Sequence, residues 1–95
     1  MNIQQFKNAL ERQTLESKIK SCKNLIAFWK KTEQEYRDNS TDLTKRLSEI
    51  GRWELIRKCK QHRKEHENDL AYYEIQLNRN DLIEALGSLI EDTDK

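Results

Sequence analysis

Residues 38–42 read DNSTD, and this short polar stretch divides the chain into two long helix-forming segments. Asp, Asn, Ser and Thr side chains can hydrogen-bond to nearby backbone groups in place of the helical ladder, and Ser40 or Thr41 can cap a following helix. The flanking segments contain no proline and are rich in Gln, Glu, Lys and Leu, which favour helix. Because so short a turn makes two helices antiparallel neighbours, the sequence predicts an all-α fold: a long helical hairpin with arms over 2–37 and 41–78.

Apolar residues of the first arm occupy two faces. Ile3, Phe6 and Leu10 share one face. The other face, rotated by roughly 120°, holds a longer set with helical spacing: Leu15, Ile19, Cys22, Ile26, Trp29 and Tyr36. We therefore expect this helix to meet two different neighbours along its length.

The apolar pattern of the second arm changes sides at Gly51. Before it, Leu43, Leu47 and Ile50 share one side. After it, a seam repeats with the alternating spacing of three and four that marks a coiled coil: Ile56, Cys59, Arg63, His66, Leu70, Tyr73 and Leu77. Glycine is costly inside a helix and common just past a helix end, so the change predicts a kink or break of this arm near Gly51.

The end of the chain and the pairing of the arms complete the expected fold. Asp81 and Glu84 have capping-box spacing, which predicts a separate short helix over 81–90 that folds back on the hairpin or docks on another subunit. Pairing the arms about the turn brings together positions whose numbers sum to about 80, which sets Cys22 opposite Cys59. The chain, 1–95, is expected to form a single helical domain.

The charges are segregated along the chain. The net charge is only +1, yet residues 45–64 carry eight Lys or Arg against two Glu, and residues 65–95 carry a net charge of −7. A basic band beside two tryptophans is typical of a surface that binds a partner. The predicted partner-binding residues are Trp29, Lys30, Arg52, Trp53, Arg57, Lys58, Lys60, Arg63 and Lys64.

No motif predicts catalysis. Residues 62–66, HRKEH, match the H-x-x-E-H pattern of some zinc proteases, but a slim hairpin offers little volume for a substrate cleft. A Cys2His2 zinc set and a disulfide between the two cysteines are further alternatives, although two free thiols packed in the core are favoured over both. The zinc set would comprise Cys22, Cys59, His62 and His66. The sequence therefore predicts a non-enzymatic protein without metal or cofactor.

Two functions fit these features. The first is a protein–protein interaction module that binds or blocks a macromolecule through the central basic and aromatic surface, as a small phage, viral or mobile-element inhibitor or adaptor would. The alternative is a nucleic-acid-binding protein that uses the same band against phosphates. Surplus apolar side chains such as Phe28 and Leu55 predict a homodimer or higher homo-oligomer. With no long apolar run and no signal-peptide pattern, the expected location is the cytoplasm, with neither a membrane nor a small-molecule substrate as partner.

Overall fold

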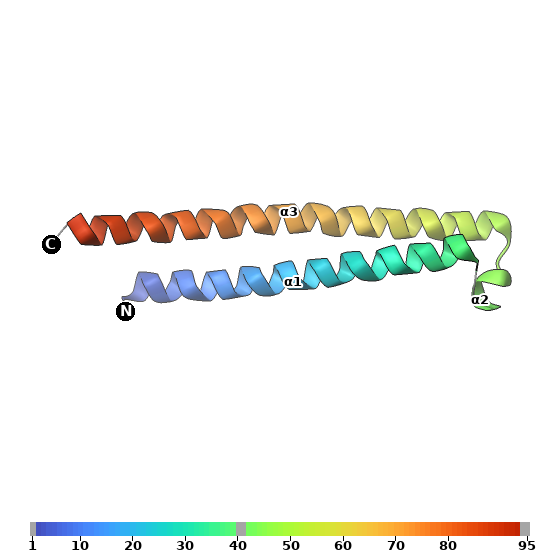
Figure 1. Ribbon diagram of the computed structural model, residues 1–95, viewed down its shortest axis with the longest axis horizontal. Coiled ribbons are helices and arrows are strands. Elements are labelled where there is room, and N and C mark those ends of the chain that lie inside the picture. Colours follow the sequence, from blue (N-terminus) through green and yellow to red (C-terminus); the bar gives the residue numbers. More distant parts are fainter. Residues whose placement is uncertain (1, 40–41, 94–95) are drawn as a thin grey trace.

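In the computed structural model, the backbone is described for residues 2–39 and 42–93, and the side chains for these residues except 43 and 88–93. Two long helices, α1 (Ile3–Asp38) and α3 (Glu49–Thr93), run antiparallel and pack on each other (Figure 1). A connection that contains the short helix α2 (Asp42–Lys45) joins them. The molecule is a rod of 71 × 17 × 15 Å, and the predicted all-α helical hairpin is confirmed.

Polar caps fix both ends of α1. At its start, Asn2 and Gln5 form a capping box, in which the Asn2 side chain accepts a hydrogen bond of 2.8 Å from the Gln5 backbone N–H. At its end, Asn39 adopts the left-handed conformation with φ of 50°, and its backbone N–H donates to the carbonyl of Glu35. Helix α1 therefore matches the predicted first arm to within one residue at each end.

The connection between the long helices is longer than the predicted turn. Helix α3 starts just after Ser48, whose Oγ accepts a hydrogen bond of 3.0 Å from the backbone N–H of Gly51. Gly51 thus lies in the first turn of α3, where an added Cβ would stand only 3.1 Å from that hydroxyl. The break falls ahead of Gly51, between α2 and α3, because Ser48 satisfies a backbone donor that a helix start leaves unpaired. Residues 40–41 and the side chain of Leu43 lie outside the described part.

Helix α3 continues without a break to Thr93, so the expectation of a separate helix over 81–90 is wrong. Asn80 does not cap a new helix but lies in the seam at 5% exposure. Its Nδ2 donates to the Asn8 carbonyl at 3.3 Å and to Oε2 of Glu11 at 3.2 Å. Because the helical ladder is intact here, the capping-box spacing that predicted a new start finds no free backbone donor to satisfy.

A single seam between α1 and α3 forms the core. Its buried apolar residues belong to the two periodic sets read from the sequence: Leu15, Ile19, Cys22, Ile26, Ile56 and Cys59. The other apolar face of α1 is open, since Ile3, Phe6 and Leu10 are 75%, 55% and 48% exposed. Within the described residues, the hairpin therefore provides one of the two neighbours expected for this helix.

The two helices pair in a different register from the expected one. Trp29 stacks on His62 with ring centroids 4.5 Å apart, and Lys18 Nζ lies 5.3 Å from the ring centre of Tyr73. Facing positions therefore sum to 91 in both pairs instead of about 80. The longer connection moves the centre of the hairpin toward the C-terminus, and the predicted pairing of the arms is wrong by about ten residues.

Candidate interaction surface

A shallow hollow near the turn end of α3 brings together three of the predicted residues. Trp53, Arg57 and Lys60, together with Ile56, line a hollow of about 290 Å³. Spacings of three and four residues make these side chains neighbours on the helix surface. Ile56 is 2% exposed, whereas Trp53 is 48% exposed. The hollow thus combines a buried apolar residue with an accessible indole and two cations.

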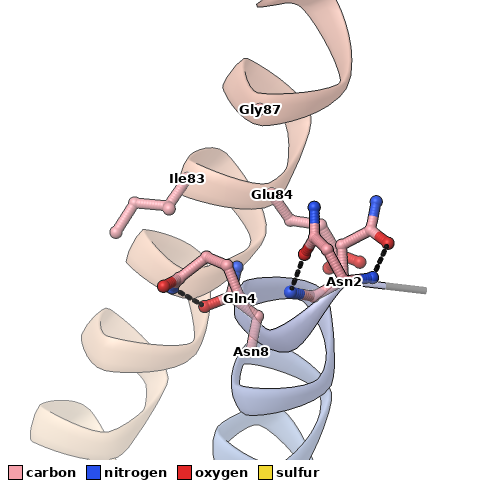
Figure 2. A pocket seen from close by; sticks show the side chains of 7 residues that line it. Asn2, Gln4, Asn8, Ile83, Glu84 and Gly87 are labelled. Atoms are coloured by element: carbon pink, nitrogen blue, oxygen red, sulfur yellow. Dashed lines mark hydrogen bonds between the residues drawn. The ribbon is translucent and has the colours of Figure 1, made fainter. Parts of the chain in front are cut away.

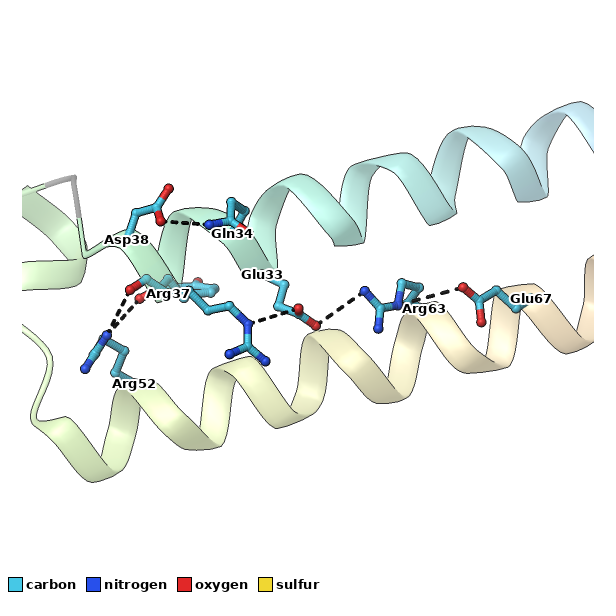
Figure 3. A network of polar contacts seen from close by, with 8 residues as sticks. Glu33, Gln34, Arg37, Asp38, Arg52, Arg63 and Glu67 are labelled. Carbon is cyan, nitrogen blue, oxygen red and sulfur yellow. Dashed lines mark hydrogen bonds and ion pairs between the residues drawn. The ribbon is translucent and has the colours of Figure 1, made fainter.

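Two arginines flank the Trp53 ring. The Cζ atoms of Arg52 and Arg37 lie 5.6 Å and 6.0 Å from the ring centre, within the range of a cation–π interaction. Arg52 Nη1 donates to the carbonyls of Tyr36 and Arg37, both at 3.3 Å (Figure 3). Carbonyls at a helix C-terminus lack helical partners and favour a nearby cation, so the end of α1 holds Arg52 beside Trp53.

Lysines continue this surface along one edge of the seam between the helices. Because Arg37 and Trp53 face each other, Lys30 and Lys60 take equivalent positions one heptad further along. Both lysines are exposed, and among the described residues neither forms an ion pair. One more heptad along α3, Glu67 occupies this edge in place of a cation. We define the basic–aromatic face as Lys30, Arg37, Trp53, Arg57 and Lys60.

Two predicted residues belong to the seam rather than to this face. Trp29 is half-buried against His62, and its Nε1 is buried without a hydrogen-bond partner. Arg63 Nη1 lies 3.7 Å from Glu33 Oε1, and Arg63 Nε lies 3.8 Å from Glu67 Oε1 (Figure 3). The charge of Arg63 is therefore compensated within the hairpin.

The remaining predicted lysines lie on the exposed surface of α3. Lys64 follows Lys60 by one helical turn and extends the face, whereas Lys58 lies about 100° around the helix from Arg57. Arg37 was missed, because the expected register placed it about ten residues away from Trp53. Its sequence signal is a cation in the last turn of a helix, where the helix dipole favours positive charge.

The two cysteines are free and lie apart, offset along the rod by about 15 Å. Burial raises the pKa of both thiols, and the carboxylates of Asp69 near Cys22 and Glu33 near Cys59 raise it further. The thiolate that binds a metal is therefore disfavoured at each position. In the part of the chain that the structure describes, no three His, Cys, Asp or Glu side chains gather closely enough to hold a metal ion.

A second hollow, of about 160 Å³, lies at the open end of the rod, and side-chain amides of α1 contribute to its lining (Figure 2). Asn8 is 8% exposed there, and its Oδ1 accepts a hydrogen bond of 3.1 Å from Gln4 Nε2. Ile83 and Gly87 line the hollow from α3, and a Cβ added at Gly87 would meet no atom within 4 Å. Because the amides here bond to one another, this hollow offers few free groups to a ligand.

Comparison with known proteins gives no relative: no protein-family model, no curated protein and no solved structure matches the chain. Among the described helices, none has a stretch long and apolar enough to cross a membrane. The chemistry of the exposed surface is therefore the basis on which a function can be proposed.

Proposed function

We propose that this protein is a non-enzymatic helical interaction module that binds an acidic segment of another protein through the basic–aromatic face. The observation that carries the proposal is a half-exposed tryptophan, Trp53, beside a hollow whose cations Arg57 and Lys60 have no internal counter-charge among the described residues. Tryptophan and arginine are the residues most often responsible for binding energy at protein interfaces.

The form of the hollow favours a protein as the partner. The exposed half of Trp53 offers apolar surface to a leucine-sized side chain, and the cations at the edge of the hollow would pair with carboxylates beside that side chain. The flanking arginines hold the indole in place before any partner arrives, which lowers the entropic cost of binding. An acidic segment with an apolar anchor matches all of these features.

Two lysines, one on each long helix, would add to the attraction between the hairpin and an acidic partner. Lys30 and Lys60 take equivalent positions on the two helices, so a carboxylate bound between them would form ion pairs with both. A rod that binds in this way, with no reacting group on the face, would act by occupying its partner's surface, as an inhibitor or adaptor does.

Adjacent lysines on α1 provide a matched test. Lys30 belongs to the basic–aromatic face, whereas Lys31 is also exposed but lies about 100° around the helix. The probe is a synthetic helical peptide with glutamates on one face and leucines on the other, and its binding is followed by Trp53 fluorescence in a Trp29→Phe background. Lys30→Glu should weaken binding about tenfold, while Lys31→Glu should change it by less than about twofold.

Equal effects of the two charge reversals would contradict a localised face, and absence of peptide binding to the parent protein would contradict the proposal itself. Circular dichroism of each variant establishes that the helices are intact. Trp53→Ala supplies a second arm: loss of an interface tryptophan should weaken binding by about thirtyfold.

Nucleic acid is the second candidate, favoured by a row of exposed cations without ion pairs among the described residues. The row comprises Lys30, Arg57, Lys60 and Lys64. It predicts binding of a short DNA duplex whose affinity falls steeply with salt, by a log–log slope of about −0.9 for each phosphate contact. Duplex binding with such a slope, together with no binding of the acidic peptide, would favour this function over the first.

A further inference from the structure

The chain exposes more surface than a folded monomer of its size usually does. Its accessible surface is 7584 Å² for 11.5 kDa. Monomeric proteins of this mass expose about 5,800 Å², so the excess is about 1,800 Å². An obligate homodimer buries about 1,000–2,500 Å² on each chain, and the excess surface of this chain falls within that range.

Five of the twelve large apolar side chains that are exposed among the described residues share one side of the hairpin. These five are 41–59% exposed: Leu25, Phe28, Tyr72, Ile83 and Leu86. Leu25 lines a hollow with Asp69 and Tyr73, which places it on the same edge of the seam as Asp69. Ile83 follows Asp69 by two heptads and so lies on that edge as well. We call these five residues the apolar side.

The apolar side and the basic–aromatic face lie on opposite edges of the seam. Leu25 directly precedes the buried seam residue Ile26, whereas Lys30 directly follows the seam residue Trp29. On a helix these positions fall on either side of the seam. Burying the apolar side would therefore leave the basic–aromatic face free.

The distribution of charge indicates what covers the apolar side. Residues 20–66, at the turn end of the rod, carry thirteen Lys or Arg and seven Asp or Glu, a net charge of +6. The other end, residues 1–19 together with 67–95, carries a net charge of −5. Two copies of this chain side by side in opposite directions would bring each basic end against an acidic one, and a parallel pair would oppose like charges.

The apolar residues are also spaced for such an arrangement. Facing positions sum to 91, so Tyr72 lies at about the level of residue 19 of α1 and Ile83 lies near residue 8. Tyr72 is therefore midway along the rod between Phe28 and Ile83. A two-fold axis at Tyr72 would set Phe28 of each copy against Ile83 of the other.

We propose that a second copy of this chain packs on the apolar side, in the opposite direction, so that two hairpins form a four-helix bundle about a two-fold axis near Tyr72. The bundle buries the excess surface and presents one basic–aromatic face per copy at its exterior. The proposal does not depend on what the basic–aromatic face binds.

Sedimentation equilibrium of the full chain tests this arrangement. We expect a dimer in the parent protein, and Phe28→Glu or Ile83→Lys alone should weaken it by about tenfold or more, because each places a charge among apolar side chains. The double variant Phe28→Glu with Ile83→Lys should recover most of the loss, since the two positions meet across the axis. Glu74→Lys, at an exposed position about 200° around α3 from Tyr72, is the control and should leave the dimer unchanged.

Three outcomes would overturn the proposal: a monomeric parent protein, a dimer indifferent to both single changes, or failure of the double variant to recover association. Oxidative cross-linking gives a reading that does not depend on the affinity. Tyr72→Cys should yield a covalent dimer through the axis and Glu74→Cys should not, while the buried native thiols stay unreacted. Equal cross-linking at the two positions would contradict an axis at Tyr72.

Discussion

Glu33 shows how one residue can join the two helices. Its side chain is 12% exposed in the seam, where Arg37 Nε lies 3.1 Å and Arg63 Nη1 lies 3.7 Å from its carboxylate oxygens. A buried carboxylate is costly unless cations compensate it, and here one cation comes from each helix (Figure 3). The residue therefore fixes the register locally while leaving Arg37 beside Trp53.

Removing this carboxylate should destabilise the hairpin. Glu33→Ala leaves two partly buried arginines short of a partner, and we expect the free energy of unfolding to fall by about 1–2 kcal/mol in urea denaturation. Glu35→Ala, two residues away on the exposed surface, is the control and should change it by less than about 0.5 kcal/mol. Equal effects of the two substitutions would contradict the structural role of Glu33.

At the scale of the elements, the sequence predicted the features that depend on residues close together in the chain. The ends of α1 were predictable because Asn2 and Asn39 cap them, and the buried stripes were predictable because apolar spacing marks them. The start of α3 at Glu49 was not predictable, because Gly51 is a stronger helix-breaking signal in the sequence than the Ser48 side chain that caps the helix. That difference lengthens the connection and shifts the register by about ten residues.

The candidate site was predictable to the same extent: neighbours on one helix could be predicted, and contacts between the two helices could not. Trp53, Arg57 and Lys60 were predictable as a group because they lie on one helix, where spacing alone makes them neighbours. The contribution of Arg37 depends on how two helices pair, which no local signal specifies. Contacts between α1 and α3 therefore could not be predicted from the sequence.

The seam also predicts how stability depends on pH. Burial raises the pKa of Cys22 and Cys59 in the folded state, so the fold retains protons that the unfolded chain loses above about pH 8.5. Stability is then fully present below that pH and falls as pH rises through the alkaline range. The free energy of unfolding should drop more between pH 8 and 10 in the parent protein than in the Cys22→Ala, Cys59→Ala double variant. Identical slopes in the two proteins would contradict the burial of the thiols.

At the scale of the whole molecule, the rod has two sides with different chemistry. One side carries the cations and Trp53, and the other carries the exposed apolar side chains that we assign to a second copy. Such a division would allow the proposed assembly and the proposed partner binding to use separate surfaces of one short chain of 95 residues. Both surfaces are assembled from two helices, so both depend on the register in which α1 and α3 pair.

Nuclear Overhauser effects between aromatic side chains measure that register most directly. The structure stacks the ring of Trp29 on that of His62 at 4.5 Å, so cross-peaks between their ring protons are expected. A sample in which labelled chains are diluted with unlabelled ones restricts the signal to contacts within one chain. Cross-peaks between the Trp29 and His62 rings would support the account, whereas cross-peaks from Trp29 to Trp53 in their place would contradict the register and both surfaces built on it.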